Sequence, residues 1–158
     1  MRSTRLYTGV VQADWLDELD HMNFLQYQRV ADQATGLFWA EIGGEEPSAE
    51  ARLAFVIVET HVRYQHELRL GDPVDIETRL IGHDHRRVHL HHSLLRGDEV
   101  VSIVQVLGLA FDVETRRAGR WTPEMLDELV TWPVQDGDDA HRGLMNWVLR
   151  PSTAGRAS

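Results

Sequence analysis

The sequence contains no cysteine and no lysine among its 158 residues. The absence of cysteine excludes disulfides, zinc sites built on thiolates and cysteine nucleophiles, although it leaves the redox compartment open. All 16 basic residues are arginine, which excludes Schiff-base chemistry through a lysine amine. The chemistry of this chain must therefore use other groups.

Long apolar runs and an excess of positive charge are also missing. No apolar run approaches the roughly 20 residues that span a bilayer, and the first residues lead into an alternating stretch rather than the apolar core of a signal peptide. The formal net charge is -9, and no basic stripe reverses it locally. We therefore expect a cytoplasmic protein that binds neither nucleic acid nor a membrane.

The overall composition is that of a folded domain. Hydrophobic residues make up 42% of the chain and charged residues 26%, which is ordinary for a globular protein. There is room for one sizeable core but not for a second domain. We expect a single domain over residues 1–150 and a frayed tail over residues 151–158.

An amphipathic helix is predicted over residues 23–42. Its apolar residues recur every three or four positions, as on one face of a helix: Tyr27, Ala31, Ala34, Phe38 and Ile42. Asn23 or Asp20 is suited to cap its start. Gly43 and Gly44 are suited to end it, because glycine adopts the left-handed conformation at a helix C-terminus without a steric penalty.

Most of the remaining chain is predicted to form an antiparallel sheet. A first strand is expected at residues 6–12, and four more follow an acidic linker, at residues 54–69, 74–83, 86–96 and 99–112. A short helix capped by Thr122 is expected at residues 123–130, with a loop at 133–143. This order indicates an α+β fold in which the long helix buries its apolar face against one face of the sheet.

The segment of residues 15–23 concentrates charged groups directly before the long helix. It carries Asp17, Glu18, Asp20 and His21. Free N–H groups and the positive end of the helix dipole could polarise a carbonyl oxygen here, while a carboxylate attacks it or activates water. Alternatively, one acid only caps the helix and the others are solvated loop charges. Spacing alone leaves both readings open.

Residues 17–27, Asp-Glu-Leu-Asp-His-Met-Asn-Phe-Leu-Gln-Tyr, resemble the signature Asp-x-x-Gly-His-Val/Met-Asn-x-x-x-Tyr of hotdog-fold thioesterases in the 4-hydroxybenzoyl-CoA thioesterase-like group. Residues 58–64 and 67–72 resemble the strand and the Gly-Asp turn that follow the central helix in that family. The order and spacing fit from Tyr7 to Asp112. The short motifs Trp-Leu-Asp, His-Met-Asn and Val-Glu-Thr-His are similar to those of one branch of this family. That branch is associated with carnitine and betaine breakdown and with cleavage of betainyl-CoA.

The resemblance implies a hotdog fold, with a long central helix wrapped by five to six antiparallel strands, and hydrolysis of a small acyl-CoA thioester. It also implies a homodimer or homotetramer with the acyl-CoA site at a subunit boundary, without a cofactor or metal. By position, Asp17 matches the catalytic carboxylate, which acts as nucleophile or general base. His21 and Asn23 match residues that shape the loop entering the helix, and Glu59 lies on the strand expected to face the same pocket.

The candidates for substrate binding lie in the same segments: Trp15, Asp20, Met22, Tyr27, Phe55 and His61. Trp15, Trp39 and Phe55 could help to enclose an acyl group, and aromatic residues beside Glu59 could hold a quaternary ammonium by cation-π attraction. Equally, such aromatics are often core residues. Glu59 could be a polar residue paired across the strand or at a subunit interface.

Asp20 is the main departure from the family pattern, because it occupies the position where the family usually has glycine. A second carboxylate there could repel the oxyanion, or it could raise one pKa and supply a protonated donor. A non-catalytic acyl-CoA binding module, in which Asp20 abolishes turnover, therefore stays open. An acyl-CoA hydratase or dehydratase also stays open, because the resemblance includes hotdog proteins that pair an acid with a histidine for proton transfer, and Asp17 and His21 could take these roles.

Two further clusters have alternatives of their own. His89 and His91 would share one strand face with a conceivable metal site, but inward-facing Val88, Leu90 and Leu94 place both histidines on the outer face as ordinary polar residues. No metal site is therefore predicted.

Five arginines are candidates for binding the phosphates of coenzyme A, or they are solvated surface charges: Arg86, Arg87, Arg116, Arg117 and Arg120.

Overall fold

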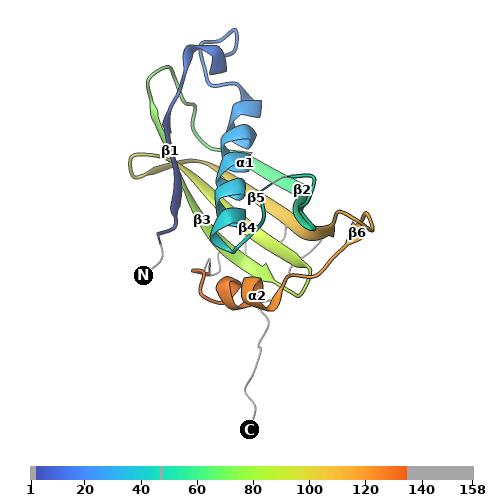
Figure 1. Cartoon of the computed structure of the whole chain (residues 1–158). Helices are drawn as coiled ribbons and strands as arrows, with labels where there is room; N and C mark the ends of the chain where they lie inside the picture. Colours follow the sequence, from blue (N-terminus) through green and yellow to red (C-terminus); the bar gives the residue numbers. More distant parts are fainter. Residues whose placement is uncertain (1–2, 47, 135–158) are drawn as a thin grey trace.

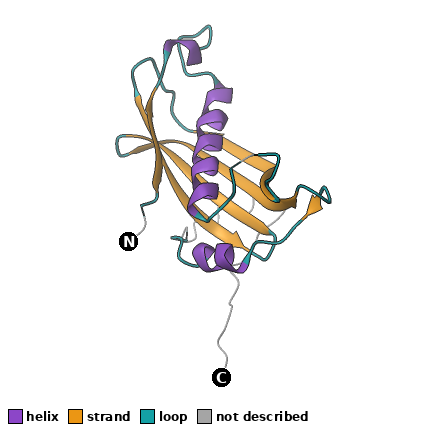
Figure 2. Ribbon diagram, in the orientation of Figure 1, coloured by secondary structure: helices purple, strands orange, loops and turns teal. Residues whose placement is uncertain are grey.

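The structure, a computed structural model, describes residues 3–46 and 48–134. One long helix, α1, crosses one face of an antiparallel sheet, and a short helix, α2, lies at one end of it (Figures 1 and 2). The elements follow in the order β1 (Arg5–Val10), η1 (Ala13–Trp15), α1 (Phe24–Glu41), β2 (Leu53–Tyr64), β3 (Pro73–His83), β4 (Arg87–Arg96), β5 (Glu99–Asp112), β6 (Arg117–Ala118) and α2 (Pro123–Leu129).

The strands pair in the order β1-β3-β4-β5-β2, and β6 adds a short pairing to β5. Every pairing is antiparallel. The β4–β5 hairpin turns through Gly97, whose φ of 63° lies in the left-handed region that glycine adopts without strain. β1 and β2 form the two edges, and β2 is a long edge of 12 residues.

α1 lies against the sheet because one side of it is continuously apolar. The side chains of Val30, Ala34 and Phe38 are 0% exposed and contact the sheet-facing core. Truncation of a fully buried phenylalanine such as Phe38 to alanine costs about 3–5 kcal/mol. The helix is therefore held by packing along its length. Within the described residues, no helix combines the length and apolar character needed to span a bilayer.

A β-bulge in β2 decides which side chains of this strand face α1. Ile57 pairs with Gly108, whereas Glu59 pairs with Leu107, so that Val58 is an extra residue. Side chains of directly paired residues share a face, and an extra residue shifts the alternation by one. Phe55 and Ile57 therefore lie on the helix side, and Glu59 lies on the opposite side.

The predicted elements are confirmed with shifted ends. The strand expected at 54–69 ends at Tyr64, because the chain then turns away and buries Leu68, 0% exposed, from a loop. η1 and β6 were not predicted. The predicted tail at 151–158 and the predicted loop at 133–143 beyond Val134 lie outside the described residues, and the single-domain division stays a prediction.

The histidines of β4 divide between the two faces of the sheet. His89 and His91 lie opposite α1, as predicted, but they are 0% and 3% exposed rather than surface residues. Their Nε2 atoms lie 3.0 Å from Gln105 Oε1 and 3.1 Å from Ser93 Oγ, respectively. In the part of the chain described, no group of three or more ionisable side chains is arranged to hold a metal.

Candidate active site

Asp17 lies in a closed loop between η1 and α1. Its backbone N–H donates to the carbonyl of His21 at 2.8 Å, and a β-bridge between Leu16 and Met22 closes the loop. One carboxylate oxygen of Asp17, Oδ1, accepts the N–H groups of Leu19 at 2.9 Å and His21 at 3.2 Å. Its second oxygen, Oδ2, makes no hydrogen bond within the described residues. One oxygen is thus fixed and the other is available.

Asn23 joins this loop to the start of α1. Its side-chain oxygen accepts the N–H of Leu25 at 2.9 Å, which is the cap expected for asparagine at this position. Its own N–H donates to the carbonyl of Trp15 at 2.8 Å. The Asp17 loop and the positive end of the α1 dipole are therefore held side by side.

A cleft of about 300 Å³ opens beside this junction. We call it the Asp17 cleft, and its lining includes Asp17, His21, Met22, Phe24, Tyr27 and Tyr64. Asp17 is half-buried and Met22 is buried, whereas Phe24 is 57% exposed. The cleft thus places a carboxylate, a helix N-terminus and apolar side chains around one open space.

Tyr27 fixes the wall of the cleft opposite the loop. Its hydroxyl accepts the N–H of Leu68 at 3.1 Å and donates to the carbonyl of His66 at 3.5 Å. Its ring meets that of Tyr64 edge-on, with centroids 5.2 Å apart. Burial raises the pKa of the Tyr27 hydroxyl, which keeps it protonated as a structural donor.

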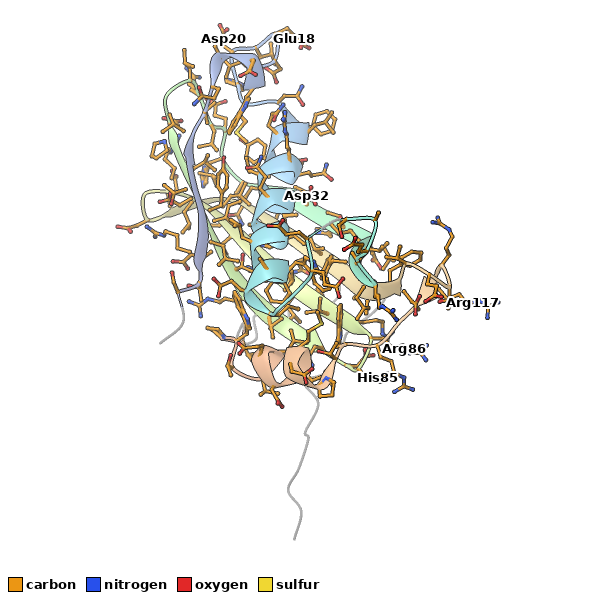
Figure 3. The ribbon with its side chains drawn as sticks, in the orientation of Figure 1. Glu18, Asp20, Asp32, His85, Arg86 and Arg117 are labelled. Atoms are coloured by element: carbon orange, nitrogen blue, oxygen red, sulfur yellow. The ribbon has the colours of Figure 1, made fainter. Side chains whose placement is uncertain are left out.

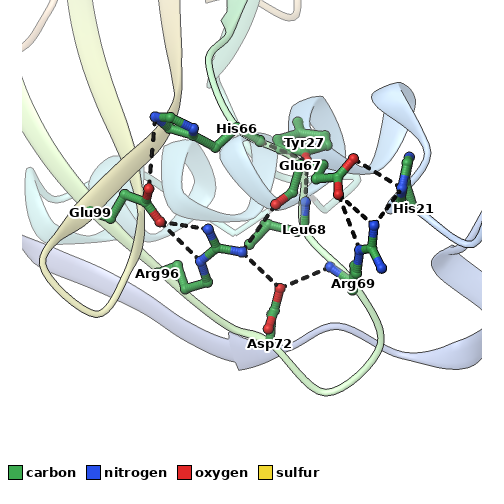
Figure 4. A network of polar contacts seen from close by, with 9 residues as sticks. All are labelled: His21, Tyr27, His66, Glu67, Leu68, Arg69, Asp72, Arg96 and Glu99. Atoms are coloured by element: carbon green, nitrogen blue, oxygen red, sulfur yellow. Dashed lines mark hydrogen bonds and ion pairs between the residues drawn. The ribbon is translucent and has the colours of Figure 1, made fainter.

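A network of charged side chains borders the cleft (Figure 4). Glu67 lies between His21 Nε2, at 2.9 Å, and the guanidinium of Arg69, at 2.7 Å. The hydrogen bond from Arg69 holds the pKa of the Glu67 carboxyl below its usual range. Next to this group, Arg96 contacts Asp72 at 3.2 Å and Glu99 at 2.6 Å. Glu67, which lines the cleft, and Glu99 behind it are therefore ionised and paired with arginine.

Residues 11–129 match the family model described as the thioesterase-like superfamily. The matched range contains the Asp17 loop, α1 and all of the sheet except β1. This chain belongs to the thioesterase-like superfamily. Its fold is the hotdog fold predicted from the sequence, with a long helix against an antiparallel sheet.

The relatives of this chain include proteins that are named for a substrate. The chain is 32% identical over 126 residues to an L-carnitine dehydrogenase/betainyl-CoA thioesterase of Agrobacterium fabrum, covering 79% of this chain and 26% of that protein. It is 28% identical over 141 residues to a betainyl-CoA thioesterase of Pseudomonas aeruginosa, covering 87% and 86%. The chain thus spans about a quarter of the Agrobacterium protein and most of the Pseudomonas one.

Two solved structures share the fold of this chain. A candidate thioesterase from Pseudomonas putida KT2440 matches with a TM-score of 0.74 and 26% identity, covering 100% of this chain and 97% of that one. A Staphylococcus aureus protein in complex with CoA matches with a TM-score of 0.72 and 21% identity, covering 82% and 84%. The second likeness shows the fold alone.

Four of the predicted site residues line the Asp17 cleft: Asp17, His21, Met22 and Tyr27. Asn23 lies next to them as the helix cap. Trp15 contacts the core and accepts the Asn23 N–H, so it supports the loop from behind. The roles predicted for these residues stay predictions.

Asp20, at the position where the resemblance expects glycine, has a left-handed backbone conformation. Its φ is 59°, in the left-handed region where aspartate is tolerated better than most residues. Its side chain is exposed at the tip of the loop (Figure 3) and does not line the Asp17 cleft. The role predicted for Asp20 in substrate binding stays a prediction.

Glu59, expected on the strand that faces the Asp17 pocket, does not line the Asp17 cleft of the same chain, and its catalytic role stays a prediction. The bulge at Val58 turns Glu59 and His61 to the sheet face opposite α1, where Glu59 lies close enough to His89 to influence its pKa. Phe55 remains on the helix side, but it lines a different cavity near Trp39. Strict alternation from Phe55 would place Glu59 on the helix side, and the sequence carries no signal for the extra residue.

The cleft also contains residues that the sequence did not single out as site residues. Tyr64, His66 and Glu67 line it from β2 and the loop that follows. Tyr64 and Glu67 belong to the two segments that carried the family resemblance, which was the available signal, and His66 lies between these segments. The predicted phosphate-binding arginines lie elsewhere: Arg86 and Arg117 are at the opposite end of the molecule from Asp20 (Figure 3), and Arg87 pairs with Asp84 at 2.7 Å.

Proposed function

We propose that this chain hydrolyses a small acyl-CoA thioester at the Asp17 cleft. The position of the Asp17 carboxylate carries this proposal. Two backbone N–H groups fix Oδ1, and Oδ2 makes no hydrogen bond with any described residue beside an open cleft at the start of α1. Membership of the thioesterase-like superfamily supports the reaction class.

In the proposed reaction the thioester carbonyl lies against the N-terminus of α1. Leu25 and Gln26 donate their N–H groups to Asn23, whereas the N–H of Phe24 has no partner among the described residues. This N–H group and the positive end of the helix dipole would stabilise negative charge on the carbonyl oxygen. Asp17 either attacks the carbonyl carbon or takes a proton from the attacking water. The carbon–sulfur bond breaks, the CoA thiolate leaves, and the net addition of water gives the free acid.

Two alternative functions are less well supported. A hydratase or dehydratase would need His21 for proton transfer, but its Nε2 is paired with Glu67 at 2.9 Å. A non-catalytic binding module was suggested by Asp20, yet this side chain is exposed and does not line the cleft. The acyl group of the relatives, betainyl, makes betainyl-CoA the first substrate to test.

We also propose that two copies pair through β2. Among the described strands, β2 pairs only with β5, so that its other side forms an edge, and Ile57 and Val58 on it are 37% and 52% exposed. An exposed apolar edge is a template for pairing with another strand. An antiparallel pairing of the two β2 strands would extend one sheet across both copies and give the homodimer, or half of the homotetramer, predicted from the resemblance.

Thiol release from a panel of CoA thioesters tests the activity. Betainyl-, short-chain, medium-chain and aryl-CoA are incubated with the protein, and free CoA is followed with a chromogenic thiol reagent. We expect turnover of at least one thioester. Loss of the conjugated double bond of an enoyl-CoA without thiol release would favour a hydratase. Tight binding of a non-hydrolysable acyl-CoA without any turnover would favour the binding module.

A further inference from the structure

A second cavity, of about 350 Å³, lies between the C-terminal half of α1 and the first half of β2. We call it the aromatic cavity, because the rings of Trp39 and Phe55 form much of its wall, with centroids 5.9 Å apart. Trp121 stacks behind Phe55 at 6.3 Å. The Trp39 indole N–H already donates to the Glu45 carbonyl at 2.8 Å, so that the ring offers its apolar surface and π-electrons to the cavity.

The charged groups at the aromatic cavity all carry the same sign. Asp32 and Glu45 line it, and no arginine or histidine in the described part of the chain does. Asp32 is exposed, stands midway along α1 (Figure 3) and forms no ion pair with any residue that the structure describes. Glu45 Oε2 accepts only a backbone N–H, that of Arg52, at 2.8 Å. An apolar aromatic space under unneutralised carboxylates suits a cation with an apolar surface.

Building on hydrolysis at the Asp17 cleft and on the β2 pairing proposed above, we propose that the aromatic cavity binds a quaternary ammonium group on the acyl part of the substrate. Such a cation needs no hydrogen-bond acceptors. Its methyl groups contact the faces of Trp39 and Phe55, and its charge is balanced by Asp32. This makes Asp32 a residue that sets specificity and not a catalytic one.

Within one chain, the aromatic cavity is too far from Asp17 to serve a small acyl group. Asp32 and Trp39 stand 9 and 16 residues beyond the Asn23 cap, which corresponds to about 13 and 24 Å along the helix axis. The substrate must therefore use the cleft of one copy and the cavity of the other.

The arrangement of α1 and β2 brings these two places together in a dimer. α1 and β2 run antiparallel: the Tyr64 hydroxyl donates to the Phe24 carbonyl at 3.1 Å at one end, and Trp39 contacts Phe55 at the other. If two β2 strands pair antiparallel, the Tyr64 end of one copy lies beside the Phe55 end of its partner. The Asp17 cleft then faces the partner's aromatic cavity.

A matched pair of thioesters isolates the role of the charge. Betainyl-CoA and 3,3-dimethylbutanoyl-CoA have the same shape, but a quaternary carbon replaces the quaternary nitrogen in the second. We expect wild type to show a kcat/KM about tenfold or more higher for betainyl-CoA. Asp32→Asn should remove most of that preference by lowering kcat/KM for betainyl-CoA alone. Glu41→Gln, which removes a carboxylate from α1 outside the cavity, should leave both values unchanged.

A binding experiment gives a second readout that does not depend on turnover. Titration with tetramethylammonium chloride, followed by calorimetry, should show saturable binding to wild type and to Glu41→Gln, and none to Asp32→Asn. Equal kcat/KM for the two thioesters, together with no saturable binding to wild type, would overturn the cation site. Failure of thioester hydrolysis itself would appear differently, as no thiol release from any CoA ester while tetramethylammonium still binds.

Discussion

His92 is a single residue whose ionisation is coupled to the stability of the fold. It lies between α1 and the sheet, where Nε2 is 3.0 Å from Thr35 Oγ1 and Nδ1 is 2.9 Å from Thr78 Oγ1. Complete burial lowers its pKa from 6.5 to about 3. The neutral ring therefore links α1, β3 and β4 through two hydroxyl groups.

The low pKa of His92 predicts a loss of stability in acid. Between pH 6.5 and about 3 the unfolded chain binds a proton at this residue and the folded chain does not. The free energy of unfolding should therefore fall as the pH drops through this window, by about 1.4 kcal/mol per pH unit. His92→Gln, which cannot titrate, should flatten this dependence in urea unfolding at several pH values.

The control for His92 is the exposed His85, since His85→Gln should leave the pH dependence as in wild type. Burial also lowers the pKa values of His83 and His89, so a residual slope is expected in the His92 variant. An unchanged slope in His92→Gln would show that His92 does not carry the effect.

At the residue scale, the sequence was most informative within one contiguous segment. Asp17, His21, Met22 and Tyr27 meet in the cleft because a tight loop and the first turn of α1 fix their spacing. Tyr64 and Glu67 come from positions about 40 residues away, and their approach depends on how β2 and its following loop lie against α1. The periodicity of a sequence predicts single helices and strands, but it does not predict which distant segments come close together.

At the scale of elements, β5 and β2 are fitted to each other through Gly108. A Cβ atom at Gly108 would lie 2.0 Å from the Phe55 ring, so the absence of a side chain makes room for this wall of the aromatic cavity. We expect Gly108→Ala to displace Phe55 and to lower the free energy of unfolding by about 1–3 kcal/mol. Thermal or urea unfolding measures the change.

Gly36 on α1 has free space around it, in contrast to Gly108. A Cβ atom there would meet nothing within 4 Å. Gly36→Ala should therefore stabilise the protein by about 0.5–1 kcal/mol, because alanine loses less conformational entropy in a helix. If both alanine variants changed stability in the same direction, the close approach of Phe55 to Gly108 would not be the cause.

The sequence predicted most of the helices and strands, but it did not predict which side chains of β2 face α1. The 3.6-residue period of α1 and the turns around Gly71 and Gly97 set most element ends within a few residues. The bulge at Val58 has no compositional signal, yet it reverses the faces of every residue after it in β2. This is why Glu59 was expected beside Asp17 and lies on the opposite side of the sheet.

At the scale of the whole molecule, the account depends on two copies meeting at β2. Val58→Arg places a charge on this edge at a residue that is 52% exposed in one chain. We expect this variant to shift sedimentation velocity from dimer or tetramer toward monomer, and to lose thioesterase activity with it. Val130→Arg, at a residue that is 65% exposed at the end of α2, should change neither property.

Thiol release by Asp17→Asn, measured beside wild type and Asp14→Asn, tests the central claim most directly. Asparagine keeps the Oδ1 contacts of the loop, so folding should be intact by circular dichroism, and Asp14 is an exposed carboxylate on η1 nearby. We predict that kcat for the best CoA thioester falls about 100-fold or more in Asp17→Asn and stays near wild type in Asp14→Asn. Robust turnover by folded Asp17→Asn would contradict the assignment of Asp17 as nucleophile or general base.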